Sequence, residues 1–299
     1  MLTVPSALVP LLLRGIRANR AFVTAAGARK RVRERELRPA PYGPPSRLRA
    51  DVAVGVIRTH EWPVYTVTPR GGSPVGSVVY LHGGGWVGEI VSQHWALAAQ
   101  IAAEANTTVI LPIYPLIPFG TARQVVAGVV DLVVESRARY GDACLAGDSA
   151  GGQIALSAAL RLRDEHGITV PRTVLVSPAL DLTWGNPRIP EVQPSDPWLA
   201  TPGGKVFAAL WAGELDLTHP DVSPLSGDLA GLGPITLFTG TRDVLNPDAG
   251  LLVAKARAAG GEIDVHERVG DVHVFPLLPT RAGRAARAVI VADLARALA

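Results

Sequence analysis

The 299-residue sequence has little cysteine, little charge and few aromatic side chains. Its single cysteine, Cys144, excludes an intrachain disulfide, so nothing in the sequence favours an oxidising compartment. Charged residues make up only 18% of the chain and hydrophobic residues 48%, which predicts a folded protein with a large core rather than a disordered one. Cysteine and histidine nowhere cluster with the spacing of metal ligands, and we expect neither a metal nor an organic cofactor.

The sequence also lacks an apolar run long enough to cross a bilayer, which takes about 20 residues. The apolar start at residues 1–13 contains Pro5 and Pro10. Its positive charges follow the apolar stretch, whereas a secretory signal carries them before it. We therefore expect no signal peptide, no transmembrane helix and a cytoplasmic location.

Charge is distributed unevenly along the chain. Residues 1–38 carry nine basic and two acidic side chains, a net charge of +7, although the whole chain has a net charge of only +3. This segment either packs on the body as a helix with its arginines in water, or contacts an anionic membrane or a lipid-like substrate. No aromatic platform accompanies the arginines, so we expect no nucleic-acid partner.

A proline-rich connector at residues 39–50 separates this segment from residues 51–299, where short apolar strands alternate with helices. We expect strands at 52–58, 63–68, 75–81, 107–114, 143–146, 173–176, 235–239 and 263–268, and helices at 92–104 (with Ser92 as the N-cap), 122–140, 151–163, 246–259 and 281–298. Such alternation predicts an α/β fold whose parallel sheet is covered by helices on both faces.

Residues 182–234 interrupt this alternation with eight prolines and one expected helix at 203–212. A loop of this length in a compact α/β domain is usually a lid or an inserted element. It begins after the carboxyl end of a strand, at the edge where α/β sheets bind ligands. We predict that it forms a cap over the site, with the N-terminal cap segment and linker at 1–50 as its partner and the remainder of 51–299 as the body.

Two glycine-rich strings each follow a strand-like run. Residues 147–152, GDSAGG, fit the pattern G-x-S-x-G, which places Ser149 on a sharp strand-to-helix turn with its hydroxyl exposed. Residues 82–86, HGGGW, form the kind of string that aims backbone N–H groups at a developing oxyanion. Either string alone is a weak signal, but together they indicate acyl transfer by a serine hydrolase.

A serine nucleophile needs a base, and the base needs an orienting acid, in the chain order Ser, Asp or Glu, His. Asp243 directly follows the strand at 235–239 and is the candidate acid, with Asp181 as the runner-up. His273 lies in the loop between the last strand and the last helix and is the candidate base. The other six histidines precede Ser149, or lie in a linker, in the insertion or within a strand.

The two strings, together with 177–183, 221–225 and 270–275, resemble the hormone-sensitive-lipase-like branch of the α/β-hydrolases, the carboxylesterases and lipases of bacterial family IV type. This resemblance implies an eight-stranded, mostly parallel sheet with a helical cap. It makes Ser149 the nucleophile, Asp243 the acid and His273 the base. It further implies an oxyanion hole from the N–H groups of Gly84, Gly85 and Ala150, with His82, Gly83 and Asp148 in supporting positions.

The predicted activity is hydrolysis of carboxylic esters, with short to medium acyl chains, through an acyl-enzyme intermediate. The expected partner is a small-molecule ester, and a homodimer is left open. A non-catalytic small-molecule receptor on the same fold is the rival interpretation, although the chain retains every member of the expected triad. An amidase, a lactonase or a transacylase would use the same residues and stays open as well.

Overall fold

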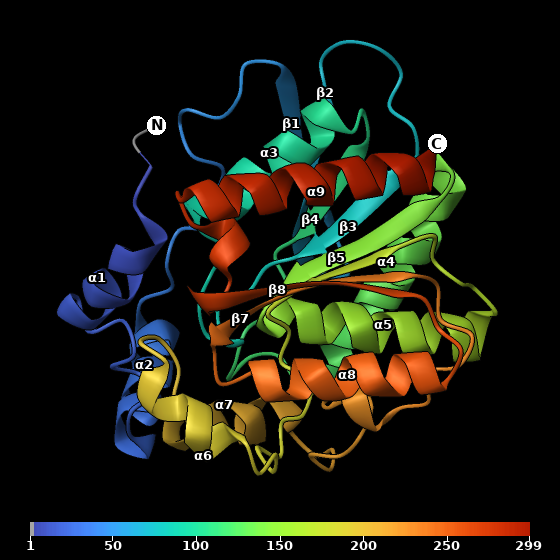
Figure 1. Cartoon of the computed structure of the whole chain (residues 1–299). Coiled ribbons are helices and arrows are strands. Elements are labelled where there is room, and N and C mark those ends of the chain that lie inside the picture. The colour runs from blue at the N-terminus through green and yellow to red at the C-terminus, as the bar shows by residue number, and fades with distance from the viewer. Residues whose placement is uncertain (1–2) are drawn as a thin grey trace.

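An eight-stranded sheet forms the centre of the computed structural model, which describes residues 3–299 (Figure 1). The strands are β1 (Val52–Thr59), β2 (Trp62–Pro69), β3 (Ser77–Leu81), β4 (Thr108–Pro112), β5 (Ala143–Asp148), β6 (Thr173–Val176), β7 (Ile235–Arg242) and β8 (Ile263–Val272). Their order in the sheet is β1-β2-β4-β3-β5-β6-β7-β8. β2 pairs antiparallel with both β1 and β4, and every other neighbouring pair is parallel. The predicted α/β-hydrolase-type sheet is therefore confirmed.

Helices cover both faces of this sheet (Figure 1). One face packs against α3 (Ser92–Glu104) and α9 (Arg281–Leu298), and the other against α4 (Ala122–Tyr140), α5 (Ala150–His166) and α8 (Asn246–Ala258). Burial on both faces explains why the central strands are continuous apolar runs rather than alternating ones. Within residues 3–299, no helix combines the length and apolar character needed to cross a membrane.

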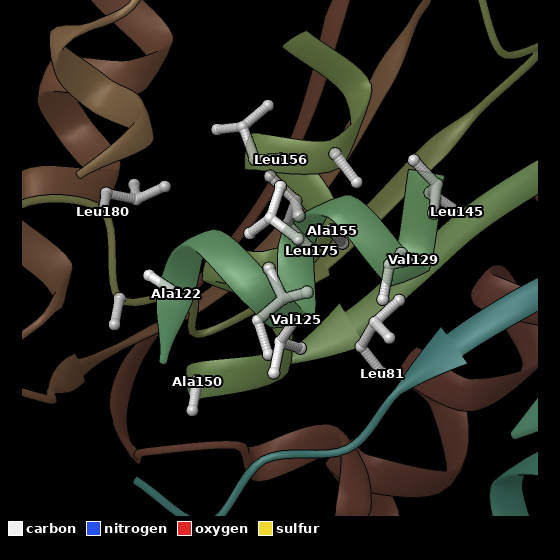
Figure 2. Close-up of a cluster of buried hydrophobic side chains, with 14 of the residues drawn as sticks. Leu81, Ala122, Val125, Val129, Leu145, Ala150, Ala155, Leu156, Leu175 and Leu180 are labelled. Carbon is white, nitrogen blue, oxygen red and sulfur yellow. The ribbon is translucent and has the colours of Figure 1, made fainter. Parts of the chain in front are cut away.

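The core beneath α4 and α5 shows how the two glycine strings are supported. Leu81, the last residue of β3, lies near Val129 of α4 (Figure 2), and Leu145 of β5 and Val125 of α4 belong to the same buried cluster. Ala155 of α5 belongs to the same buried cluster. These contacts fix the ends of β3 and β5, from which both strings emerge, against one rigid helical layer.

One helix start differs from the expectation. Val91, not Ser92, is the N-cap of α3, and its N–H donates to Nδ1 of His94 at 3.0 Å. The Ser92 hydroxyl instead donates to the neighbouring Gln93 side chain. The His94 side chain, at the third position of the helix, thus accepts from the N-cap N–H, as the glutamate or glutamine of a capping box does.

The N-terminal segment contains a 3-10 turn (Ser6–Leu8), α1 (Val9–Gly15) and α2 (Ala25–Leu37), and the insertion contains α6 (Ile189–Val192) and α7 (Thr201–Ala212). The two segments meet directly. Phe22 packs edge-on against Phe207 with ring centroids 5.2 Å apart, and the N–H of Gly203 donates to the Phe22 carbonyl at 2.7 Å. The predicted cap function of these segments remains a prediction, but their contact gives it a physical basis.

We predict that Gly203→Ala loosens this contact. A Cβ at position 203 would lie 2.5 Å from the Cα of Phe22 and 2.6 Å from the carbonyl oxygen of Ala21, and both of these are backbone atoms. The melting temperature should fall by a few degrees, which corresponds to about 1–2 kcal/mol. Trypsin should also cleave faster within residues 1–38. Gly250→Ala on α8 is the control, because no atom lies within 4 Å of its added Cβ. Equal protease resistance of the two variants would contradict the prediction.

Candidate active site

The carboxyl ends of five adjacent parallel strands converge at one edge of the sheet. In sheet order these are β3, β5, β6, β7 and β8. The residues that follow them directly are the glycine string at 82–86, Ser149, Ser177, Asp243 and His273. This edge is where α/β sheets bind ligands, because the loops there are free to vary while the strands hold them in place.

Ser149 occupies a strained turn between β5 and α5. Its φ of 52° and ψ of −117° are unfavourable for a residue with a side chain. A Cβ at Gly147 would lie 2.3 Å from the carbonyl oxygen of Gly151, and a Cβ at Gly151 would lie 2.0 Å from that of Leu81. Both glycines of the pattern are therefore required by close backbone approach, which lets the turn point the serine into the site.

Ser149, His273 and Asp243 form a continuous chain of hydrogen bonds. The Oγ of Ser149 lies 2.9 Å from Nε2 of His273, and Nδ1 of His273 lies 2.7 Å from Oδ2 of Asp243. All three side chains are buried. Because the carboxylate can only accept, Nδ1 carries the proton and Nε2 is free to accept the hydroxyl proton. The runner-up Asp181 instead accepts from the N–H of Thr183.

A further carboxylate, Asp196, lies beside this chain and was not singled out by the sequence. It is buried in the insertion, and it accepts hydrogen bonds from the N–H groups of Trp198 (2.7 Å), Leu199 (2.9 Å) and Val244 (2.9 Å). Val244 directly follows Asp243, and the Trp198 ring packs edge-on against the His273 ring with centroids 5.9 Å apart. Asp196 thus links the insertion to the loop that carries Asp243.

The buried carboxylates control the charge state of His273. Burial alone would lower the pKa of His273, but the charge and hydrogen bond of Asp243, together with the charges of Asp196 and Asp148, outweigh burial and raise it. Burial and the neighbouring Asp243 in turn raise the pKa of Asp196. The pKa of His273 is therefore higher than burial alone would make it, which favours the imidazolium form.

The glycine string is held against the serine turn by Asp148. Its carboxylate accepts from the Tyr80 hydroxyl at 2.7 Å and from the Gly83 N–H at 3.1 Å, and it lies 3.3 Å from Nε2 of His94. Burial alone would raise the pKa of Asp148, but His94 and the Tyr80 hydrogen bond lower it overall. A Cβ at Gly83 would lie 2.2 Å from Oδ2 of Asp148, so only glycine permits this approach.

His82 stabilises the string from its other side. Its Nδ1 donates to the Gly83 carbonyl at 2.7 Å, and its own carbonyl accepts from the Tyr114 hydroxyl at 2.6 Å. Burial, followed by the nearby His94, lowers the pKa of His82 to about 4. The ring is therefore neutral at physiological pH and acts as a hydrogen-bonding brace. Beyond it the chain turns at Gly84 and Gly85, which have φ values of 131° and 61°.

Two further polar residues make contacts that no sequence pattern indicates. Gln153, fully buried on α5, accepts from the indole N–H groups of Trp86 (3.1 Å) and Trp211 (2.8 Å), which joins the glycine string to α7 of the insertion. Ser177, after β6, accepts from the N–H of Val274 at 3.0 Å and so fixes the residue next to His273. Each partner is far away in sequence, and only the fold reveals the pairing.

A cavity of about 930 Å³ opens onto this site. Its lining includes Gly84, Gly85, Ser149 and His273 from the body, and Phe22 from the N-terminal segment. The cavity therefore extends from Ser149 to the N-terminal segment. Among residues 3–299, no group of three or more histidine, cysteine or acidic side chains is arranged to hold a metal ion.

Comparisons with known proteins agree with this architecture. Residues 78–277 match the family model described as the alpha/beta hydrolase fold. A triacylglycerol lipase of Mycobacterium tuberculosis is 32% identical over 72% of this chain, and the match covers 45% of that lipase. An acetyl-hydrolase of Streptomyces hygroscopicus is 30% identical over 68% of this chain and 70% of its own. The crystal structure of an esterase from the bacterial hormone-sensitive lipase family superposes with a TM-score of 0.81 at 25% identity, covering all of both chains.

The fold and the family match define the protein as an α/β hydrolase. The chain belongs to the hormone-sensitive-lipase-like branch of that family, as the two glycine strings indicated. It is an enzyme of the carboxylesterase and lipase type.

We predict that Asp196→Asn lowers the pKa of His273. The substitution removes a negative charge that favours the imidazolium, so the pKa should fall, by up to about one unit. The charges that remain facing the ring, those of Asp243 and Asp148, are unchanged. The measurement is an NMR titration of the His273 ring. Glu191→Gln removes an exposed carboxylate from the same insertion and should leave the titration unaltered. An unshifted His273 in the Asp196 variant would contradict this electrostatic role.

Proposed function

We propose that the protein hydrolyses carboxylic esters with Ser149 as nucleophile, His273 as base and Asp243 as orienting acid. The observation that carries this proposal is the continuous Asp243–His273–Ser149 hydrogen-bond chain, with distances of 2.7 and 2.9 Å, at the edge of the cavity. The esterase and lipase relatives support the same chemistry. Alignment of all three groups in the resting protein means that little reorganisation precedes attack.

The proposed reaction proceeds in two stages. Ser149 Oγ attacks the ester carbonyl carbon while Nε2 of His273 takes the hydroxyl proton, and Asp243 stabilises the resulting imidazolium. The tetrahedral intermediate collapses, His273 gives its proton to the leaving alcohol, and the acyl group remains on Ser149. Water then attacks the acyl carbonyl carbon while His273 takes its proton. The second tetrahedral intermediate breaks the bond to Ser149 Oγ, which regains the proton from His273 as the carboxylic acid leaves.

The N–H groups of Gly84, Gly85 and Ala150 are proposed to stabilise the oxyanion. Ala150 is the first residue of α5, so its N–H has no acceptor within the helix. The N–H groups of Gly84 and Gly85 donate to no acceptor within residues 3–299, whereas that of Gly83 is already bound to Asp148. Each such donor typically contributes roughly 3 kcal/mol to transition-state stabilisation.

The proposed substrates carry short to medium acyl chains. The cavity near Ser149 is lined by Phe22, Phe207 and Leu199, which suit an acyl chain. Phe22 and Phe207 pack edge-on against each other and so limit its length. The names of the relatives range from acetyl-hydrolase to triacylglycerol lipase, which leaves the chain length to experiment.

Replacing the nucleophile gives the direct test. We expect Ser149→Ala to lower kcat/KM for p-nitrophenyl acetate by at least about ten-thousandfold, because no other group is placed to attack the carbonyl. A fluorophosphonate should label the wild-type protein on Ser149, as read by mass spectrometry of its peptides. Ser46→Ala, in the proline-rich connector, is the control and should retain activity and labelling. Near-wild-type hydrolysis by Ser149→Ala would refute the proposal.

The acyl-chain limit can be tested at Phe22. We expect Phe22→Ala to shift the preferred p-nitrophenyl ester towards longer acyl chains, because the ring restricts the cavity beside Phe207. The measurement is kcat/KM across a series from acetyl to palmitoyl. Leu37→Ala, at an exposed position of α2, should keep the wild-type preference. An unchanged profile in the Phe22 variant would show that the N-terminal segment does not set chain length.

A further inference from the structure

The outer face of α1 is apolar and exposed, which is unusual for a short surface helix. Leu8, Leu11, Leu12 and Ile16 are between 48% and 73% exposed. Leu11 and Leu12 lie in α1, and Leu8 and Ile16 are its N-cap and C-cap residues. Leu8, Leu12 and Ile16 are each four residues apart, and Leu11 is three residues from Leu8, so the four side chains share one side, called here the outer face of α1. The inner side is apolar too, because Val9 and Leu13 are buried against Val272 of β8. Burial against the body therefore explains only half of the apolar residues in this helix.

The same segment is strongly basic. Residues 1–38 carry nine basic and two acidic side chains, and Arg14, Arg17, Arg20, Arg29, Lys30, Arg33 and Arg38 are exposed. Bulk water leaves the apolar leucines uncovered, and a neutral apolar partner offers no counter-charge to the arginines that flank them. Together they suit a surface with an apolar interior and an anionic rim, which is the interface of a bilayer that contains anionic lipids.

The exposed face of α1 is continuous with the opening of the cavity. Ile16 belongs to the exposed face and also lines the cavity that contains Ser149 and His273. Arg17 and Arg20 are likewise both exposed and part of the lining, which also includes the half-buried Arg31 and Arg35 of α2. Side chains that line a cavity while facing solvent mark its mouth, so whatever covers α1 also faces the mouth.

We propose that the outer face of α1 docks on an anionic phospholipid surface and turns the cavity mouth towards it. This inference rests on the proposed ester hydrolysis and narrows its substrate class to acyl esters carried in a membrane. An ester in the bilayer would enter past Ile16 and the arginines, with its acyl chain directed towards Phe22 and Ser149. In Figure 1, α1 and α2 lie on the same side of the molecule, remote from α4 and the C-terminus.

The test measures binding separately from catalysis. The full-length protein is sedimented with vesicles of phosphatidylcholine alone, or of phosphatidylcholine mixed with phosphatidylglycerol. We expect binding to the anionic vesicles only, and weaker binding at high salt because the arginine contribution is screened. Ser149→Ala should bind as the wild type does, so failure of the proposed catalysis would leave this result unaffected.

Two variants identify the docking face. The triple variant Leu8→Ser, Leu11→Ser, Leu12→Ser replaces exposed side chains that do not line the cavity, and it should bind anionic vesicles at least about tenfold more weakly. Its hydrolysis of soluble p-nitrophenyl acetate should equal that of the wild type. The control triple Val56→Ser, Val75→Ser, Leu251→Ser replaces comparably exposed apolar residues elsewhere and should bind normally.

Three outcomes would overturn the proposal. They are equal binding to neutral and anionic vesicles, equal loss in both triple variants, and absence of binding by the wild type. Light scattering measures the oligomeric state and tests whether a second copy of the chain covers α1 instead. If the wild type is a dimer that the α1 triple variant converts to a monomer, a second copy of the chain occupies this face, and the membrane proposal is wrong.

Discussion

The buried carboxylate of Asp148 joins the two glycine strings on which the site is built. It immediately precedes Ser149, yet its oxygens bind the Gly83 N–H and the Tyr80 hydroxyl and lie next to His94. A buried charge is costly unless its partners satisfy it, so each of these contacts is required once the aspartate is in place. The spacing between the glycine string and the serine turn is thereby fixed, and the shape of the cavity floor follows from it.

Most of the fold could be predicted because the sequence patterns there are local. Alternating apolar strands and helices indicated a parallel sheet, and the family resemblance implied that it is eight-stranded and only mostly parallel. The predicted bounds of α4, β6 and α9 agree with the structure. The N-terminal segment could not be read in the same way. A short segment that is apolar on every side looks like buried material, and only the position of Val272 shows which side of α1 is covered.

The candidate site likewise contains some residues that could be predicted from the sequence and others that could not. Ser149, Asp243 and His273 could be found because each follows a strand, and strand order brings their loops together. Asp196 and Gln153 could not, because their partners are set by how the insertion folds back over the sheet. The N–H of Val244 lies 48 residues from Asp196, and the indole of Trp211 lies 58 residues from Gln153. No local pattern marks pairings over such separations.

The insertion and the N-terminal segment depend on each other and on the site beneath them. Gln153 ties α7 to the glycine string, Asp196 ties the insertion to the acid loop, and Phe22 rests on Phe207 of α7. The inner side of α1 is packed towards His273 through Trp198, whose ring contacts both that histidine and the apolar cluster around Val9 and Leu13. The N-terminal segment has the least informative sequence. Its buried side nevertheless connects the surface of the protein to the residues around His273.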